Sequence, residues 1–403
     1  MNNKYRKLII VALISFCAVS TSLFAGNTDR TGQAGAQHLL IDPWAKSNGW
    51  GSAGVSEIAG LESIYSNVAG IARGQNTEFG FSRTQYLSGS DNGIGINSFG
   101  ITQRLRKKDK ISGEYRELGY IGISLFTMNF GEIDRTTVEQ PEGNMGTFSP
   151  TLSYVGIHYA YKFNNYIYGG ASVKIVSESI SDLKAQGVAI DAGVQYVAGN
   201  LENFRIGVTL KNIGLPISYN GDGLSVKGFV TSTPQEITLE QRSAQAELPA
   251  LLTLGLSYDF LFFGGTEHEG KTNKERGDEG LTRKDAPHRL TLAGSFTANS
   301  YSSDQFVVGL EYGMGYKEGI GDIFQLRAGY TLDSDRLKSS KDDNGDRIPN
   351  ELSSWYTGPC AGVSFAIPLA KKKQGLQKIL LDYGYRFTNK WKGNHYIGIK
   401  LAI

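Results

Sequence analysis

One acidic stretch has the residue types and spacing of a metal site. Asp342, Asn344 and Asp346 place oxygen donors at alternate positions of the segment DDNGDRIPNE. Carboxylate and amide oxygens are the ligands that Ca²⁺ prefers in proteins. The sequence therefore offers a calcium site here, and the alternative is a solvated acidic loop without a bound ion.

Other patterns that carry chemistry are missing from the sequence. It contains no G-x-S-x-G nucleophile elbow, no H-E-x-x-H zinc motif and no phosphate-binding loop. The five histidines are scattered along the chain, which argues against a histidine metal site. We therefore expect a protein that is not an enzyme and that has no cofactor apart from the candidate calcium ion.

A further set of charged residues occurs at alternate positions of otherwise apolar segments. If these segments are strands, the charged residues share one face and the apolar residues share the other. Charges on the inner face of a membrane barrel avoid lipid and can pair across the lumen or hold a plug. We expect such an ion-paired interior rather than a path for a specific solute. The predicted lumen residues are His158, Lys174, Asp191, Arg205, Lys211, Asp259, Arg289, Arg327, Asp382, Arg386 and Lys400.

Alternation of apolar and polar residues predicts the strands that would position these charges. The predicted strands cover 78–86, 93–105, 117–130, 151–163, 166–180, 187–197, 203–213, 251–263, 288–298, 305–316, 323–332, 358–369, 379–388 and 395–403. Their number is about 14, and single-chain bacterial outer-membrane barrels have an even number. The predicted fold class is all-β, a 14-stranded antiparallel transmembrane outer-membrane β-barrel with a small N-terminal helical plug. A soluble pair of β-sandwiches is the alternative.

The N-terminus has the features of an export signal. Lys4, Arg6 and Lys7 precede the apolar stretch Leu8–Val19, and a run of small residues ends at Ala25. Residues 1–25 are therefore predicted to be a signal peptide that is removed on export, which indicates an integral protein of the cell outer membrane. Loss of three cations changes the formal net charge from +2 to about −1, which argues against nucleic acid as a partner.

Cysteine usage excludes one kind of crosslink. Cys17 lies in the predicted signal peptide, so Cys360 would be the only cysteine left after cleavage. No disulfide could then form within the chain, and we expect Cys360 to be a small buried thiol.

Residues 26–77 are predicted to form an N-terminal arm and a helical plug, here called the hatch. Residues 48–74 are rich in small residues, and Val55, Ile58 and Leu61 fall at roughly helical spacing. We expect one or two short helices in 48–74, and a short strand or extended arm around 39–41. The hatch residues selected from the sequence are Trp50, Asn67, Ala69 and Gly70.

The barrel itself is predicted to span 78–403, and strand parity assigns its loops to two sides. If the hatch lies on the periplasmic side, the first strand runs outward. Long outer loops are then predicted at about 131–150, 218–249 and 333–355, the last of which holds the calcium candidate. A long periplasmic turn is predicted at about 264–287.

This order of segments resembles the FadL-type superfamily of outer-membrane barrels, and within it the PorV/PorQ family of Bacteroidota. The segments AQHLLIDPWA at 36–45, GWGSAGV at 49–55 and LPALLTLG at 248–255 are similar to that family, whereas Val68 stands where such hatches carry proline. The resemblance implies a binding and shuttle partner in type IX protein secretion that accepts cargo at its extracellular loops. The implied partners are a large translocon barrel, the C-terminal domain of secreted cargo, an attachment complex, and outer-membrane lipid or lipopolysaccharide.

Two other functions stay open at this point. A FadL-like channel for hydrophobic small molecules would need an apolar path from the outer loops to the hatch, and the charged inner faces argue against it. A surface adhesin or a purely structural barrel is the second alternative.

Overall fold

The computed structural model describes most of the 403-residue chain. The described residues are 26–89, 93–108, 113–199, 201–230, 233–262, 267–268, 271–272, 286–315, 321–334, 357–372, 375–388 and 392–403. The predicted signal peptide at 1–25, the calcium candidates Asp342, Asn344 and Asp346, and most of the turn predicted at 264–287 lie outside these residues.

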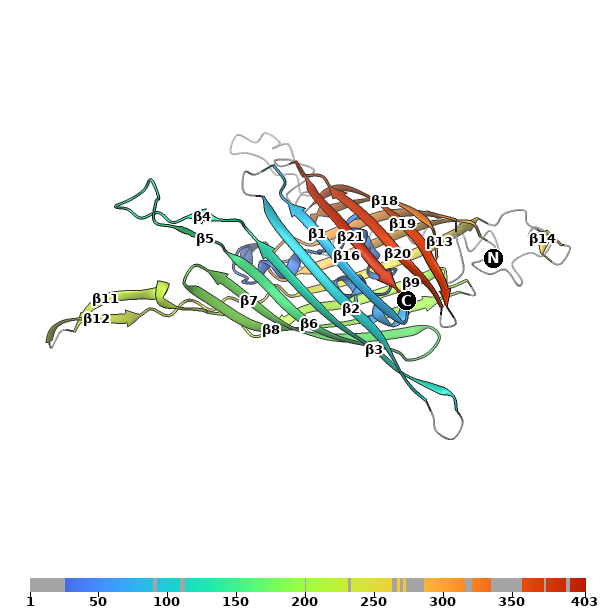
Figure 1. Ribbon diagram of the computed structural model, residues 1–403, viewed down its shortest axis with the longest axis horizontal. Coiled ribbons are helices and arrows are strands. Elements are labelled where there is room, and N and C mark those ends of the chain that lie inside the picture. Colours follow the sequence, from blue (N-terminus) through green and yellow to red (C-terminus); the bar gives the residue numbers. More distant parts are fainter. Residues whose placement is uncertain are drawn as a thin grey trace.

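Fourteen antiparallel strands close into one barrel (Figure 1). Each strand of the wall pairs with the next one along the chain, and β21 pairs back with β1. The strands are β1 (Thr77–Tyr86), β2 (Ile94–Lys108), β3 (Tyr115–Asn129), β6 (Thr151–Lys162), β7 (Ile167–Ile180), β8 (Leu183–Ala198), β9 (Phe204–Gly214), β13 (Leu251–Phe262), β16 (His288–Asn299), β17 (Gln305–Met314), β18 (Phe324–Asp333), β19 (Gly358–Lys372), β20 (Gly375–Arg386) and β21 (Asn394–Ala402).

The predicted fold class is confirmed, and each predicted strand is present with shifted ends. The largest shifts are in β8, which begins at Leu183 rather than 187, and in β20, which begins at Gly375 rather than 379. The outward side chains are apolar and exposed, as for Ile123 (50%), Ile175 (58%) and Ile397 (60%). An apolar outer surface around a closed barrel suits a lipid environment.

The two ends of the barrel differ in their connections. β1 begins and β21 ends at one end, here called the inner end, where the Thr77 amide donates to the Ile403 carbonyl at 3.1 Å. At the opposite, outer end two hairpins project from the barrel (Figure 1). They are β4 (Ile133–Asp134) with β5 (Thr147–Phe148), and β11 (Ser225–Val230) with β12 (Thr233–Glu240).

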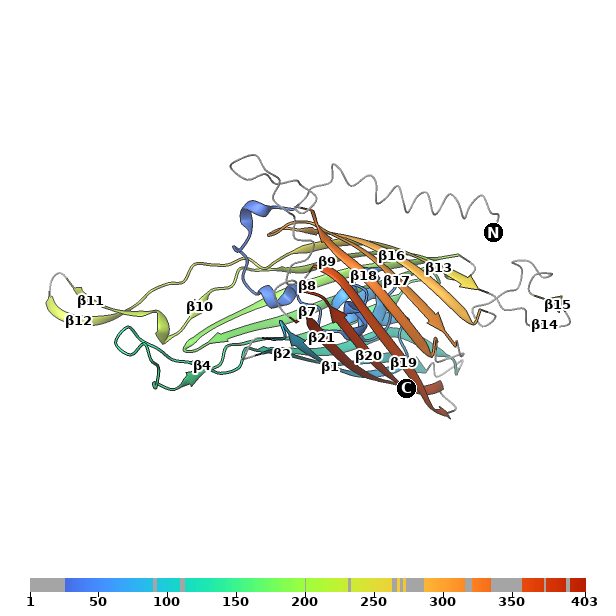
Figure 2. The ribbon, with the colours of Figure 1, turned by 90° about the horizontal axis from the view of Figure 1, so that it is seen from above.

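The remaining short elements lie in the same loops or at the inner end. Before β11, the outer loop contains β10 (Tyr219–Asn220), which pairs with β8, and the turn η6 (Asp222–Leu224). At the inner end β14 (Glu267–His268) pairs with β15 (Lys271–Thr272) (Figure 2).

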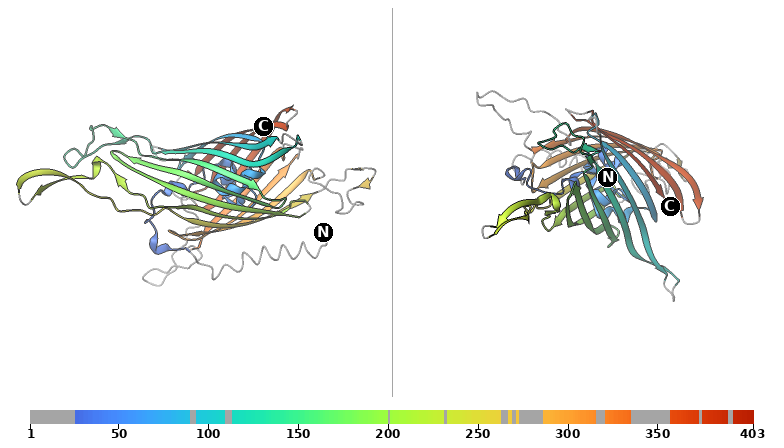
Figure 3. Two further views of the ribbon diagram at one scale, coloured as in Figure 1. Left: turned by 90° about the horizontal axis from the view of Figure 1, so that it is seen from below. Right: turned by 60° about the vertical axis from the view of Figure 1, so that its left-hand side comes forward.

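The N-terminal segment starts outside the wall at the outer end and then lies inside the barrel, where the strands enclose its later turns (Figures 2 and 3). The short helical turns of this segment are η2 (Thr28–Arg30), η3 (Gln37–Leu40), α2 (Ala45–Asn48), η4 (Ala53–Val55), α3 (Ser63–Ser66) and η5 (Val68–Arg73). No described helix has the length and apolar character needed to cross a membrane.

Two sequence predictions for this segment need correction. The expected strand or extended arm around 39–41 is largely the helical turn η3, in which Leu39 is fully buried. The expected one or two helices are instead a series of short helical segments of three to six residues. Gly51 (φ +73°) and Gly60 (φ +77°) interrupt the helical pattern, because this backbone conformation favours glycine and ends a right-handed turn.

The chain enters the lumen from the outer end. The Asn27 amide donates to the carbonyl of Asn299, the last residue of β16, at 3.4 Å. Arg30 pairs with Glu247 of the outer loop at 3.1 Å and lies 4.3 Å from the ring centroid of Tyr301. The N-terminal segment therefore runs through the barrel from its outer rim to its inner end.

Candidate functional site

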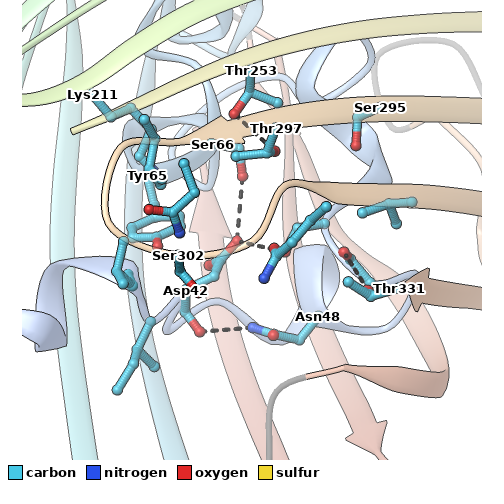
Figure 4. Close-up of a pocket in the computed structure, with 18 of the residues that line it drawn as sticks. Asp42, Asn48, Tyr65, Ser66, Lys211, Thr253, Ser295, Thr297, Ser302 and Thr331 are labelled. Carbon is cyan, nitrogen blue, oxygen red and sulfur yellow. Dashed lines mark hydrogen bonds between the residues drawn. The ribbon is translucent and has the colours of Figure 1, made fainter. Parts of the chain in front are cut away.

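A cavity of about 490 Å³ lies between the hatch and the outer halves of the strands (Figure 4). We call it the outer pocket. Arm residues 31–42 form one side, and inward residues of β13, β16, β17 and β21 form the other. Its lining combines apolar side chains with hydroxyl groups. The apolar members include Leu40, Ile41, Val55, Tyr86, Leu251, Val307 and Tyr396, and the hydroxyl members include Ser52, Ser66, Thr253, Ser295, Thr297 and Thr331.

The floor of the outer pocket is organised by the buried carboxylate of Asp42. Its Oδ1 accepts a hydrogen bond from the Trp44 amide at 2.9 Å, and its Oδ2 accepts from Ser66 at 3.3 Å and from Ser52 at 3.4 Å. The Asn48 side-chain amide donates to the Asp42 carbonyl at 2.8 Å. Burial raises the pKa of Asp42, although these hydrogen bonds and nearby cations oppose the effect.

A β-bulge lies beside the cation that lines the outer pocket. Between β8 and β9 the pairing shifts, so that Lys211 and Asn212 together oppose the single residue Asp191. Asn212 has a left-handed backbone (φ +60°), and both residues of the bulge are buried. Such a bulge re-aims side chains that strict alternation would send to opposite faces.

The two bulge residues have different partners. Asn212 accepts from Lys174 at 2.7 Å, and its amide donates to Asp191 at 2.8 Å. Lys211 instead lies over the Tyr65 ring, with its ammonium 3.4 Å from the centroid. The Tyr65 hydroxyl donates to the Leu39 carbonyl at 3.1 Å. Lys211 therefore lines the pocket as a cation held against an aromatic face.

A ring of inward glycines brings the barrel wall into contact with the hatch. A methyl group at Gly384 would lie 2.7 Å from the Ala45 carbonyl oxygen, and one at Gly170 would lie 2.9 Å from the Val68 backbone. Glycine in a strand interior commonly marks such a close approach of another backbone. The glycines whose added methyl would meet the hatch are Gly80, Gly100, Gly170, Gly193, Gly207, Gly255, Gly309, Gly329, Gly362, Gly384 and Gly398.

Ion pairs fasten the hatch on its inner side. Glu57 of the hatch contacts Arg205 of β9 at 2.5 Å and Arg289 of β16 at 3.6 Å. Arg205 also binds Asp259 of β13 at 2.8 Å. The network continues through Glu311, which pairs with Arg289 and with Arg327, the latter at 2.5 Å. All of these groups except Glu57 are buried, and Glu57 is mostly buried.

A second carboxylate of the hatch, Glu62, forms an ion pair with Lys400 of the barrel wall. The ammonium of Lys400 in β21 lies 3.1 Å from the Glu62 carboxylate and 3.9 Å from Glu78. Burial opposes ionisation of Glu62, but Lys400 outweighs it and lowers the pKa of that carboxyl group. Glu78 accepts the Leu61 amide at 2.6 Å, so the carboxylates of both residues hold the same turn of the hatch.

The structure distributes the lumen charges selected from the sequence among three places. Arg205, Asp259 and Arg327 lie in the inner network, and Asp382 joins it through Ser364, which also accepts from Arg327 at 2.6 Å. Lys211 and Arg386 line the outer pocket. Asp191 pairs with Lys174 at 2.8 Å.

The predicted hatch residues are all buried. Asn67 caps η5 by accepting from the Ala69 amide at 3.2 Å, and its side-chain amide donates to the Val55 carbonyl at 3.1 Å. Gly70 packs on the Ile58 carbonyl, and Trp50 packs with Ala53, Ala293 and Val307.

Sequence reasoning missed the carboxylates of the N-terminal segment. Asp42, Glu57 and Glu62 were not selected, although all three organise the site. A usable signal was present for the two glutamates. They are acidic residues in a small-residue segment that faces a lumen predicted to carry more cations than anions.

Among the described residues, no group of three or more His, Cys, Asp or Glu side chains could hold a metal ion. The calcium candidates lie outside that part of the chain, so the predicted site stays a prediction. Cys360 is buried, as expected from the sequence.

No protein-family model and no curated protein matches the chain. The solved structures to which it is similar include the following three. The first is CymD, a monoaromatic hydrocarbon channel, with 13% identity and a TM-score of 0.45 over 90% of this chain and 97% of CymD. The second is the Pseudomonas putida toluene transporter TodX, with 13% identity and a TM-score of 0.47 over 88% and 95%. The third is a Pseudomonas aeruginosa FadL homologue, with 9% identity and a TM-score of 0.43 over 89% and 97%. The PorV/PorQ assignment stays a prediction.

Proposed function

We propose that this protein is a FadL-like outer-membrane channel for hydrophobic small molecules, described here with its hatch closed. The observation that carries the proposal is the outer pocket. Its volume of about 490 Å³ lies in the range of small-molecule sites, which are mostly apolar with a few placed polar groups. A ligand would enter from the outer end, because arm residue Thr31 and outer-turn residue Tyr301 both reach the lining.

Passage through the barrel requires movement of the hatch. The glycine ring brings strand and hatch backbones together, and the Glu57 and Glu62 ion pairs fasten the inner side. The outer pocket is therefore a loading site in this proposal, and transport follows only when the hatch is displaced.

A pair of matched variants tests the loading site. Thr253 is buried and lines the outer pocket. The next residue of the same strand, Leu254, lies on the opposite face and is 38% exposed on the lipid side. Thr253→Phe should fill the pocket and reduce binding of decanol to the detergent-solubilised protein at least tenfold. Leu254→Phe should leave decanol binding unchanged. Equal binding by wild type and Thr253→Phe, with both folded, would rule out the pocket as the ligand site.

The second candidate is the type IX secretion role implied by the PorV/PorQ resemblance. The β11–β12 hairpin supports it, because Val226, Ile237 and Leu239 lie on one face of the hairpin and are 46%, 36% and 46% exposed. A projecting hairpin offers strand edges and an apolar face to a partner chain. Affinity purification from native membranes, with and without residues 225–240, tests this role. Recovery of lipid alone, without translocon subunits or cargo, would contradict it.

A further inference from the structure

The lipid-facing wall changes from apolar to polar within one step along β1 and β2, whereas the neighbouring strand β21 still carries the exposed Ile397 at that level. Phe81, Phe99 and Ile399 form an outward row across these strands and are 43%, 46% and 47% exposed. Two residues nearer the outer end, the next row contains Arg83 and its register partner Asn97. Rows two residues apart are separated by about 6.8 Å. Arg83 therefore lies where the hydrocarbon of the outer leaflet gives way to its headgroups.

The Arg83 side chain is exposed and held flat against the wall. Gly95 of β2 provides the space, because a methyl group there would lie 2.7 Å from Nη2 and 3.0 Å from Cζ of Arg83. Nη1 of Arg83 donates to the Asn97 side chain at 2.8 Å. Within the described chain, no carboxylate pairs with this guanidinium. Most of its five N–H donors thus remain available to an external acceptor.

Arg83 forms one side of a groove of about 270 Å³ on this wall. The lining residues are Arg83, Gln85, Gly93, Ile94, His395 and Ile397, and they include no carboxylate. His395 shares a hydrogen bond of 2.8 Å between its Nδ1 and the Tyr383 hydroxyl, and its other ring nitrogen has no partner among the described residues. Tyr385 packs beside it, with ring centroids 5.0 Å apart. Tyrosines at this level are typical of the interfacial belt of membrane barrels.

We propose that this groove binds the phosphate group of a phosphorylated lipid of the outer leaflet. A planar guanidinium matches phosphate oxygens with two parallel hydrogen bonds, and none of the described carboxylates serves as a counter-ion for Arg83. Gln85, two residues further along β1, and its register partner His395 add hydrogen-bonding groups to the lining. The acyl chains of the same lipid would lie along the apolar row of Phe81 and Phe99. This site is on the outside of the barrel and is separate from the outer pocket.

Lipid binding by the intact barrel tests this proposal. The protein is reconstituted in phosphatidylcholine nanodiscs that contain diphosphorylated lipid A, and lipid A retained by the protein is measured by native mass spectrometry. Arg83→Gln should reduce the apparent affinity about tenfold, the loss expected for a hydrogen bond to a charged group. Arg83→Lys should restore part of it. Lys184→Gln is the matched control, because Lys184 is an exposed cation at the outer end of β8.

Two further arms separate lipid from free phosphate. Lipid A without its phosphates should bind no better than phosphatidylcholine, and inorganic phosphate should not displace lipid A. Displacement by inorganic phosphate would show a general anion site instead of a lipid site. Wild-type affinity in Arg83→Gln, or equal binding of dephosphorylated lipid A, would overturn the proposal. Heat-modifiable migration in gels checks that each variant is folded.

Discussion

The ammonium of Lys211 lies 3.4 Å from the ring centroid of Tyr65, so a barrel strand touches the hatch directly at the floor of the outer pocket. Lys211 faces the lumen in step with Arg205, Gly207 and Thr209, and the bulge turns Asn212 inward beside it. Lys211 thus contacts the aromatic ring of the hatch and also lines the outer pocket. A ligand with a negative end would meet it there.

Lys211→Met should therefore discriminate between ligands that differ only in their polar end. We expect about a tenfold loss of affinity for decanoate, because a hydrogen bond to a charged group contributes roughly 1.5 kcal/mol. Affinity for decanol should change by less than about twofold, since the apolar walls are intact. Isothermal titration with both ligands measures the difference. An equal loss for the two would indicate that Met has altered the shape of the pocket.

Glu57→Gln should loosen the hatch. The variant removes the charge that faces Arg205 and Arg289, and breaking a buried ion pair is strongly destabilising. We expect the free energy of unfolding to fall by about 2–3 kcal/mol. The loss is at the lower end for a buried ion pair because Arg205 still pairs with Asp259. Thermal unfolding in detergent measures it, and uptake of a small hydrophilic dye by cells reports the leak. Glu236→Gln is the control, because its partner Lys227 is 76% exposed on a projecting hairpin. Such exposed pairs contribute little.

Alternation along the strands was sufficient to predict the barrel, because inside and outside differ in polarity at nearly every step. Ile397 and Ile399 face lipid, and Lys400 faces the hatch, as their spacing indicates. The same rule cannot detect a bulge. Lys211 was selected correctly as a lumen residue, but nothing in the pattern showed that Asn212 turns inward beside it.

The hatch was harder to predict because its order depends on contacts distant in sequence. The backbone of Ala45 is fixed by Gly384, and that of Val68 by Gly170. A run of small residues indicates that another segment packs closely against it, but it does not indicate which strand supplies the contact. Asp42 illustrates the same limit, since its hydroxyl partners Ser52 and Ser66 follow it by 10 and 24 residues.

Gly384→Ala should disturb the closed hatch more than a comparable change elsewhere on the wall. The added methyl would lie 2.7 Å from the Ala45 carbonyl oxygen and 3.3 Å from the Gly49 nitrogen, both of which are backbone atoms. Overpacking of this kind costs about 1–3 kcal/mol. Gly294→Ala is the control, since its nearest neighbour would be the Val307 oxygen at 3.7 Å. The unfolding temperature of Gly384→Ala should be lower than that of Gly294→Ala. Equal unfolding temperatures would show that the hatch backbone shifts to accommodate the methyl group without loss of stability.

Asp42→Asn should change how stability depends on pH. Burial raises the pKa of Asp42 in the folded protein, so the folded state favours the protonated form more than the unfolded chain does. Stability is then lost as the pH rises through the folded pKa. The asparagine variant cannot ionise, and its side chain can still accept from Trp44 and pair with Ser66. It should be more stable than wild type at neutral pH, and the difference should shrink as the pH falls below the ordinary carboxyl range. A difference that grows in acid would contradict this account.

The N-terminal arm should be reachable from outside the cell. The Asn27 amide binds the Asn299 carbonyl at the outer end of β16, and the side chain of Asn27 is exposed. A cysteine at this position should react with a membrane-impermeant maleimide on intact cells, with little background because Cys360 is buried. Asn165→Cys is the matched control, because Asn165 is exposed in the turn between β6 and β7 at the inner end. It should react only after the outer membrane is permeabilised. Labelling of Asn165→Cys but not Asn27→Cys on intact cells would reverse the orientation of the barrel.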